Sequence, residues 1–79
     1  MKAKVKIMLD ETINKTEGLT RNKIAVEGKI RPATISELCN GKSKSISFET
    51  LTKIIDAMNE LTEKRYVLED IIKVEYENN

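Results

Sequence analysis

The chain has 79 residues, of which 34% are charged and 39% hydrophobic, and its formal net charge is +1. This length allows one small domain, so we expect residues 1–79 to form a single unit with a modest core. The lack of histidine and the single cysteine exclude a zinc finger, a disulfide framework and a Cys–His nucleophile. No apolar run reaches the roughly 20 residues of a membrane span, and the basic start lacks a signal-peptide core. We therefore expect an intracellular, cytoplasmic protein that binds no cofactor and catalyses no reaction.

The charges are unevenly placed along the chain. Residues 1–44 carry ten basic and five acidic side chains, whereas residues 45–79 carry four basic and eight acidic ones. Such polarity is typical of a protein that presents one face to a polyanion, although small proteins also divide their charges this way by chance.

Both ends of the chain alternate charged and apolar residues. Residues 2–7 alternate lysine with apolar side chains, and residues 72–77 alternate apolar with mostly acidic ones. Alternation with period two predicts half-buried strands, and the opposite charges favour pairing of the two ends into a small clasp. Because Leu9 and Ile13 also fit a helical spacing, we predict a strand over 2–5 and a helix from about 7 to 16 that ends at Gly18.

A pair of short helices is predicted in the first half. Thr20 is a typical N-cap for a helix over about 21–28, which Gly28 ends. Pro32 opens the second helix, because proline suits the first helical position, and the pair Asn40-Gly41 ends it. Two helices of about eight residues joined by a tight turn form a helix-turn-helix unit.

The strongest helical periodicity begins after the polar, basic loop at 42–45. Ser47 is the expected N-cap of this helix, whose apolar positions are Phe48, Leu51, Ile54, Ile55 and Met58. A last short helix is predicted around 67–72, running into the terminal strand. The sequence therefore predicts an all-α fold: a compact bundle of about five short helices, with a two-strand clasp of the termini as a possible addition.

The sequence resembles the Cro/cI-type (Xre-type) helix-turn-helix regulators, whose fold is that of lambda repressor. The resemblance covers roughly residues 7–72. It is carried by the segments Leu19-Thr20-Arg21-Asn22-Lys23-Ile24-Ala25, Ile30-Arg31-Pro32-Ala33-Thr34-Ile35-Ser36-Glu37-Leu38, Asn40-Gly41 and Ile46-Ser47-Phe48-Glu49-Thr50-Leu51-Thr52-Lys53-Ile54.

One position departs from the family pattern. The family usually places glycine four residues after Ala25, where the turn needs a positive φ, but this chain has Lys29 there and Gly28 one residue earlier. Either Lys29 adopts a left-handed conformation at some cost, or the turn shifts onto Gly28.

The resemblance implies a sequence-specific regulator of transcription, a repressor, that inserts the helix at about 32–40 into the major groove of double-stranded DNA. Arg21 is expected to contact a phosphate, Ala33 and Thr34 to offer methyl groups to thymine, and Glu37 to accept from a cytosine amino group. The full set of expected DNA-contacting residues is Arg21, Arg31, Pro32, Ala33, Thr34, Glu37, Lys42, Ser43 and Lys44.

One recognition helix buries little surface, so a homodimer on a palindromic site is expected. The residues proposed for its interface are the apolar ones of the second half: Leu61, Val67, Leu68, Ile71 and Tyr76. An alternative from another class is a protein-interaction module on the same fold, antitoxin-like or anti-repressor, that works through its acidic half. A pI near 7.8, low for a DNA-binding protein, keeps this alternative open. An enzyme is disfavoured, because no nucleophile–base pair, carboxylate pair or phosphate loop occurs at a suitable spacing.

Overall fold

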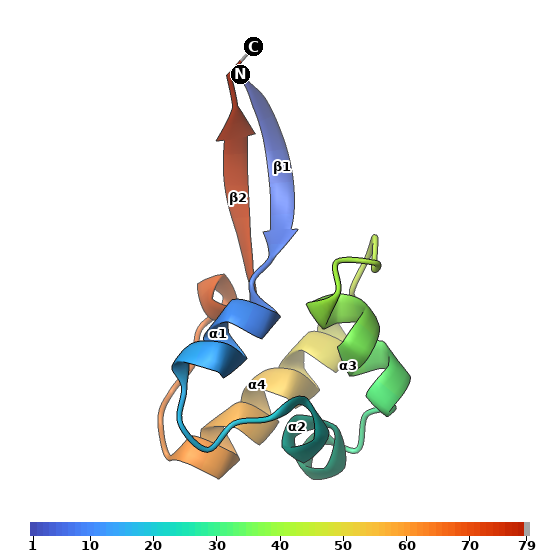
Figure 1. Ribbon diagram of the computed structural model, residues 1–79, viewed down its shortest axis with the longest axis vertical. Coiled ribbons are helices and arrows are strands. Elements are labelled where there is room, and N and C mark those ends of the chain that lie inside the picture. The colour runs from blue at the N-terminus through green and yellow to red at the C-terminus, as the bar shows by residue number, and fades with distance from the viewer. Residues whose placement is uncertain (79) are drawn as a thin grey trace.

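The computed structural model describes residues 1–78, which form four α-helices and one two-stranded antiparallel sheet. In chain order the elements are β1 (Lys2–Ile7), α1 (Leu9–Lys15), α2 (Arg21–Gly28), α3 (Pro32–Cys39), α4 (Phe48–Thr62), the single 3-10 turn η1 (Leu68–Asp70) and β2 (Ile72–Glu77). The helices form one body, and the two strands project from it as a ladder with both chain ends at its tip (Figure 1).

The predicted fold class needs two corrections. The fold is not all-α, because the terminal strands are full elements that extend over Lys2–Ile7 and Ile72–Glu77. The prediction of a fifth helix around residues 67–72 is also wrong, because only the 3-10 turn η1 forms in that segment. The first helix is also shorter than expected, because Ile7 belongs to β1 and α1 begins at Leu9. The helix-turn-helix itself agrees with the prediction, with eight residues in α2 and eight in α3.

The core is built around α4, which buries Leu51, Ile54, Ala57 and Met58 between the other helices. Burial of Leu51, Ile54 and Met58 stabilises the fold by roughly 1.5–3 kcal/mol each, before the entropy of ordering them is counted, and the smaller Ala57 contributes less. Every α-helix contributes to the largest fully buried side chains, and so does the residue directly before β2. They are Leu9, Ile24, Ile35, Leu38, Ile54, Met58 and Ile71.

The predicted caps of α2 and α4 are confirmed. The Thr20 hydroxyl accepts a hydrogen bond from the Lys23 backbone N–H at 3.1 Å, and the Ser47 hydroxyl accepts one from the Thr50 N–H at 3.0 Å. The prediction for Phe48 is wrong. It was expected on the apolar face of α4, but it is 87% exposed. The buried face of α4 begins only at Leu51.

The turn between α2 and α3 uses Lys29, not Gly28, for its left-handed residue. Lys29 has φ 54° and ψ 47°, so the first of the two alternatives is confirmed. Gly28 is needed for another reason: a Cβ there would lie 2.9 Å from Ile30 Cδ1 and 3.2 Å from the carbonyl oxygen of Lys53. The glycine therefore allows α2 to approach the backbone of α4, and the neighbouring lysine carries the backbone strain.

Replacement of Lys29 by glycine is expected to raise the free energy of unfolding by about 1 kcal/mol, because glycine adopts this conformation without a Cβ clash. Chemical denaturation measures the change. Lys44→Gly is the control, since Lys44 is exposed and has no positive φ, so glycine there only adds freedom to the unfolded chain. Equal effects of the two substitutions would contradict the assigned strain at Lys29.

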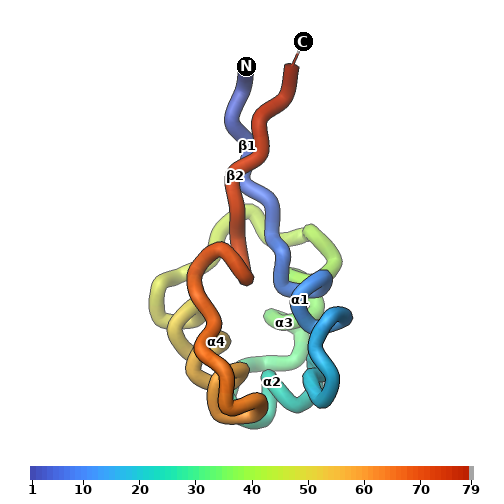
Figure 2. The backbone as a smooth tube through the Cα atoms, turned by 90° about the vertical axis from the view of Figure 1, so that its left-hand side faces the viewer, coloured from blue at the N-terminus to red at the C-terminus, as the bar shows by residue number. Residues whose placement is uncertain are grey.

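The two strands pair along their whole length, from Lys2 opposite Glu77 to Ile7 opposite Ile72. Figure 2 shows the ladder edge-on, with the strands twisting about each other above the body. The base of the ladder is fastened by two contacts: the Met8 backbone N–H donates to the Ile71 carbonyl, and the Thr12 hydroxyl donates to the Asp70 carbonyl at 2.6 Å. The predicted clasp of the termini is therefore confirmed.

Candidate nucleic-acid interface

Helix α3 is held on the body by its buried face. Ile35 is 0% and Leu38 2% exposed, and both pack into the core beside Ala25 of α2. Arg31 is the N-cap and Pro32 the first helical residue, so proline presets the backbone where no intrahelical hydrogen bond is needed. The orientation of α3 on the body is thus fixed by its apolar face and by the turn at Lys29.

The opposite face of α3 is open to solvent. Ala33 and Glu37 lie on this face by helical geometry and are exposed. The other residues expected to contact DNA here are the exposed N-cap Arg31, the exposed Pro32 and the half-buried Thr34. The side chains at the middle of this face are short, so base edges can approach the helix closely. These five residues are therefore accessible to solvent, fully or in part, at the start of α3 and on its side away from the core.

The loop after α3 continues this surface with two cations. The Lys42 backbone N–H donates to the Glu37 carbonyl at 2.9 Å, which draws the loop back over the end of the helix. The side chains of Lys42 and Lys44 are exposed. Ser43 is half-buried between them and lines the hollow between the loop and β1, so it is less accessible than its neighbours.

Arg21 occupies the first position of α2 and joins three helices. Its guanidinium donates to Asp10 of α1 at 3.0 Å and to the side-chain oxygen of Asn40, just after α3, at 3.3 Å. The hydrogen bond with Asp10 raises the pKa of Arg21 above its ordinary value, so the side chain stays charged. A guanidinium has five N–H donors, so donors remain for a phosphate after these two contacts.

Cys39 lies close to this arginine on the inner side of α3. It is half-buried and packs against the core, as expected for a small core residue. Burial raises the pKa of its thiol, and the positive charge of Arg21 opposes that shift. The thiol is therefore held in its neutral form, which is a poor nucleophile.

The cations of the surface differ in their pairing. Among residues 1–78 the ion pairs are Arg21–Asp10, Lys4–Glu77 and Lys53–Glu49. Arg31, Lys42 and Lys44 therefore have no carboxylate partner within the described chain, and a phosphate backbone can bind them without first breaking an ion pair.

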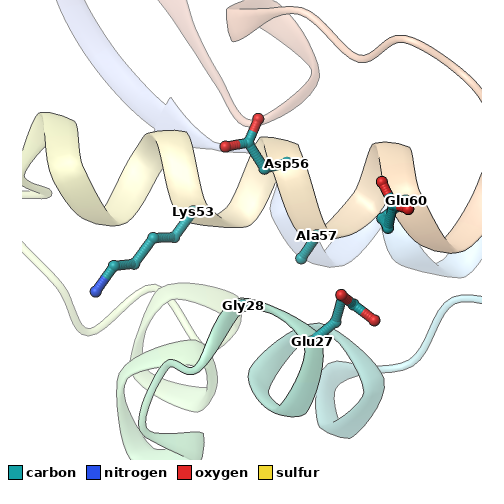
Figure 3. Close-up of a pocket in the computed structure, with 6 residues that line it drawn as sticks. All are labelled: Glu27, Gly28, Lys53, Asp56, Ala57 and Glu60. Carbon is teal, nitrogen blue, oxygen red and sulfur yellow. The ribbon is translucent and has the colours of Figure 1, made fainter.

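A separate hollow of about 350 Å³ lies between the end of α2 and the middle of α4. Figure 3 shows three carboxylates around it, from Glu27, Asp56 and Glu60, and one lysine, Lys53. This excess of negative charge repels phosphate. Within residues 1–78, no three His, Cys, Asp or Glu side chains are placed so that they could hold a metal ion together, and no helix is long and apolar enough to cross a membrane.

Sequence reasoning missed the residues that position Arg21. Asp10 lies 11 residues before it and Asn40 lies 19 residues after it. Asn40 was interpreted only as part of a helix stop, and Asp10 only as one of the acids of the first half. No local pattern connects these positions, because the contact depends on how the three helices pack.

A sequence model of the helix-turn-helix family matches residues 12–64, which is about two thirds of the chain. The matched segment includes α2, the turn at Lys29, α3 and α4, and it carries the open face described above. The chain belongs to this family of Cro/cI-type, Xre-like DNA-binding regulators. No curated protein and no solved structure matches it.

Proposed function

We propose that the protein is a sequence-specific repressor that binds double-stranded DNA as a homodimer, with α3 of each copy in the major groove. The observation that carries this proposal is the solvent-accessible part of α3 with the short side chains Ala33 and Thr34. The cations Arg31, Lys42 and Lys44 precede and follow this part in the chain, and none of them forms an ion pair among residues 1–78. Short side chains suit close approach to base edges, and the flanking cations suit the phosphate backbones on either side.

Each residue of this surface has a proposed role. Arg21, held in place by Asp10 and Asn40, donates to a phosphate next to the N-terminus of α2. The methyl groups of Ala33 and Thr34 contact thymine, and Glu37 accepts from a cytosine amino group. The remaining residues contact the edge of the DNA groove and the phosphate backbone: Arg31, Pro32, Lys42, Ser43 and Lys44.

Repression is the mode we infer, because a bound protein excludes other proteins from the same DNA without any further surface. Residues 1–79 act as one helix-turn-helix domain in the cytoplasm, without catalysis and without a cofactor. A homodimer is inferred because single modules bury only about 600–1,000 Å² on DNA, and tight specific binding generally requires two half-sites.

The test is a fluorescence-anisotropy titration with a randomised duplex pool at two salt concentrations. Affinity is expected to fall steeply with salt, because phosphate neutralisation releases counterions. Sequencing of the retained duplexes then gives the site. A folded protein that fails to bind any duplex at low salt contradicts the proposal.

Arg21→Ala is expected to weaken duplex binding about tenfold and to reduce the salt slope by about 0.9, which corresponds to one lost phosphate contact. The same titration measures both quantities. Arg65→Ala is the matched control, since Arg65 is exposed beyond the end of α4, and it is expected to leave affinity within about twofold. Equal effects of the two variants would remove Arg21 from the interface.

A further inference from the structure

The ladder has an apolar face that the body covers only at its base, where Ile7 and Ile72 pack against the core. The cross-strand pairs Ala3–Tyr76, Val5–Val74 and Ile7–Ile72 share this face. Away from the base the side chains are open to solvent: Val5 is 64%, Val74 53% and Tyr76 65% exposed. A two-stranded sheet alone is marginally stable in water, and more strands are needed to stabilise it.

The free edge of β2 carries unpaired backbone groups. Hydrogen-bonded pairs alternate along an antiparallel ladder. Since the Met8 N–H donates to the Ile71 carbonyl, the pair 8–71 is hydrogen-bonded and so is every second pair after it, including Lys6–Lys73 and Lys4–Glu75. The N–H and C=O groups of Ile72, Val74 and Tyr76 therefore point away from β1. Within residues 1–78 no other strand lies beside β2.

The free edge of β1 is less suited than that of β2 to pairing with a strand of a second copy. Its polar side chains are three lysines, Lys2, Lys4 and Lys6, and antiparallel pairing of two such strands places lysine opposite lysine. The loop at 43–46 also borders the base of the ladder, where it lines a hollow together with Val5 and Ile7 of β1 and Ile72 of β2. A second copy is therefore better accommodated at β2.

We propose that two copies of the chain join through their β2 edges, antiparallel, with Val74 on the two-fold axis. The product is a continuous four-stranded sheet in the order β1, β2, β2 and β1. This proposal rests on the homodimer of the proposed function and adds the surface and the register. Ile72 of one copy lies beside Tyr76 of the partner subunit on the apolar face.

Charge selects this register. With Val74 on the axis, Lys73 of each copy lies opposite Glu75 of the partner subunit, in non-hydrogen-bonded pairs where side chains approach most closely. A register with Glu75 on the axis would place Glu75 of one copy opposite Glu75 of the partner subunit. A register with Lys73 on the axis would place the two copies of Lys73 opposite each other. Only the first register gives two attractive pairs at the centre of the junction and leaves no like charges opposed there.

Two charge reversals test the junction by sedimentation or light scattering. Lys73→Glu and Glu75→Lys are each expected to weaken the dimer by about 30-fold or more, because each turns both central pairs into like-charge pairs. An equimolar mixture is expected to restore the dimer as a heterodimer, because both central pairs are again Glu–Lys. This rescue also controls for weakening of the ladder in Glu75→Lys, where the new lysine lies opposite Lys4.

Matched controls carry the same charge changes at positions outside the junction. Lys6→Glu changes the ladder partner of Lys73. Glu77→Lys changes the ladder partner of Lys2 and removes the exposed Lys4–Glu77 ion pair, a contact of a kind that contributes at most about 1 kcal/mol. Neither position lies opposite a charged residue across the proposed axis. Both variants are therefore expected to dimerise as the wild type does.

A cysteine at the axis tests the register directly. In a Cys39→Ala background, Val74→Cys is expected to form a covalent dimer under mild oxidation, because a hydrogen-bonded pair has its Cα atoms about 5.5 Å apart, within disulfide range. Tyr76→Cys is expected not to cross-link, since four residues of offset separate the two copies of this position by about 13 Å.

The outcomes separate this proposal from DNA binding. A wild-type protein that stays monomeric with and without duplex overturns the junction, and so does a dimer that both charge reversals leave intact. A dimer that follows the expected pattern supports the junction even if no duplex binds, a result that counts against the proposed function alone.

Discussion

Ala33→Asp is expected to abolish measurable specific binding, with a loss of affinity of about 100-fold or more. Ala33 lies on the open face of α3. A carboxylate there meets the negative potential of the groove and of its phosphates, and such a like-charge contact costs several kcal/mol. About 3 kcal/mol corresponds to roughly two orders of magnitude in the dissociation constant.

The measurement is the anisotropy titration with the selected duplex. Asn14→Asp is the matched control, because Asn14 is exposed on α1 and receives the same charge change. If both substitutions weaken binding equally, the loss reflects net charge and α3 is not the groove-reading helix. A circular dichroism spectrum identical to that of the wild type shows that the helix is retained in each variant.

Ile35→Ala is expected to lower the free energy of unfolding by about 2–5 kcal/mol. Its side chain is 0% exposed and packs in the core. Truncation loses the transfer free energy of the removed carbons and leaves a cavity that rigid neighbours fill only in part. Small domains have total stabilities at the low end of about 5–15 kcal/mol. The substitution therefore removes a large share of the total free energy of unfolding.

Urea denaturation measures this loss as a lower midpoint with an unchanged slope. Val26→Ala is the control on the preceding helix, since Val26 is 70% exposed, and it is expected to change stability by less than about 0.5 kcal/mol. A small effect of Ile35→Ala would mean that α3 is not fixed to the body by this side chain.

Sequence reasoning succeeded where the signals were local. The caps Thr20 and Ser47 and the proline at Pro32 each act within one helical turn, and α2, α3 and α4 begin at the expected residues. The prediction was wrong at Ile7 and around residues 67–72, where apolar spacing fits a helix and a strand equally. Pairing of Ile7 with Ile72, 65 residues away, decides between the two, and no short window of sequence contains that pairing.

The same distinction applies to the interface. The exposure of Ala33 and Glu37 could be predicted, because helical geometry places them opposite the buried Ile35 and Leu38. The contacts of Arg21 with Asp10 and Asn40 could not, because they depend on the packing of three helices. The interface expected from apolar composition is also corrected in part: Ile71 is fully buried and Leu61 is half-buried against the core.

The ladder joins residues that lie 65 to 75 positions apart in the chain. Closing so long a loop costs entropy before any contact is gained, so we expect this pairing to form after the helical body during folding. The strands also bury few side chains, so we expect them to open and close without unfolding of the helices. Backbone amides in the ladder therefore exchange with solvent long before those of α4, and association of two copies shows itself first as slower exchange in β2.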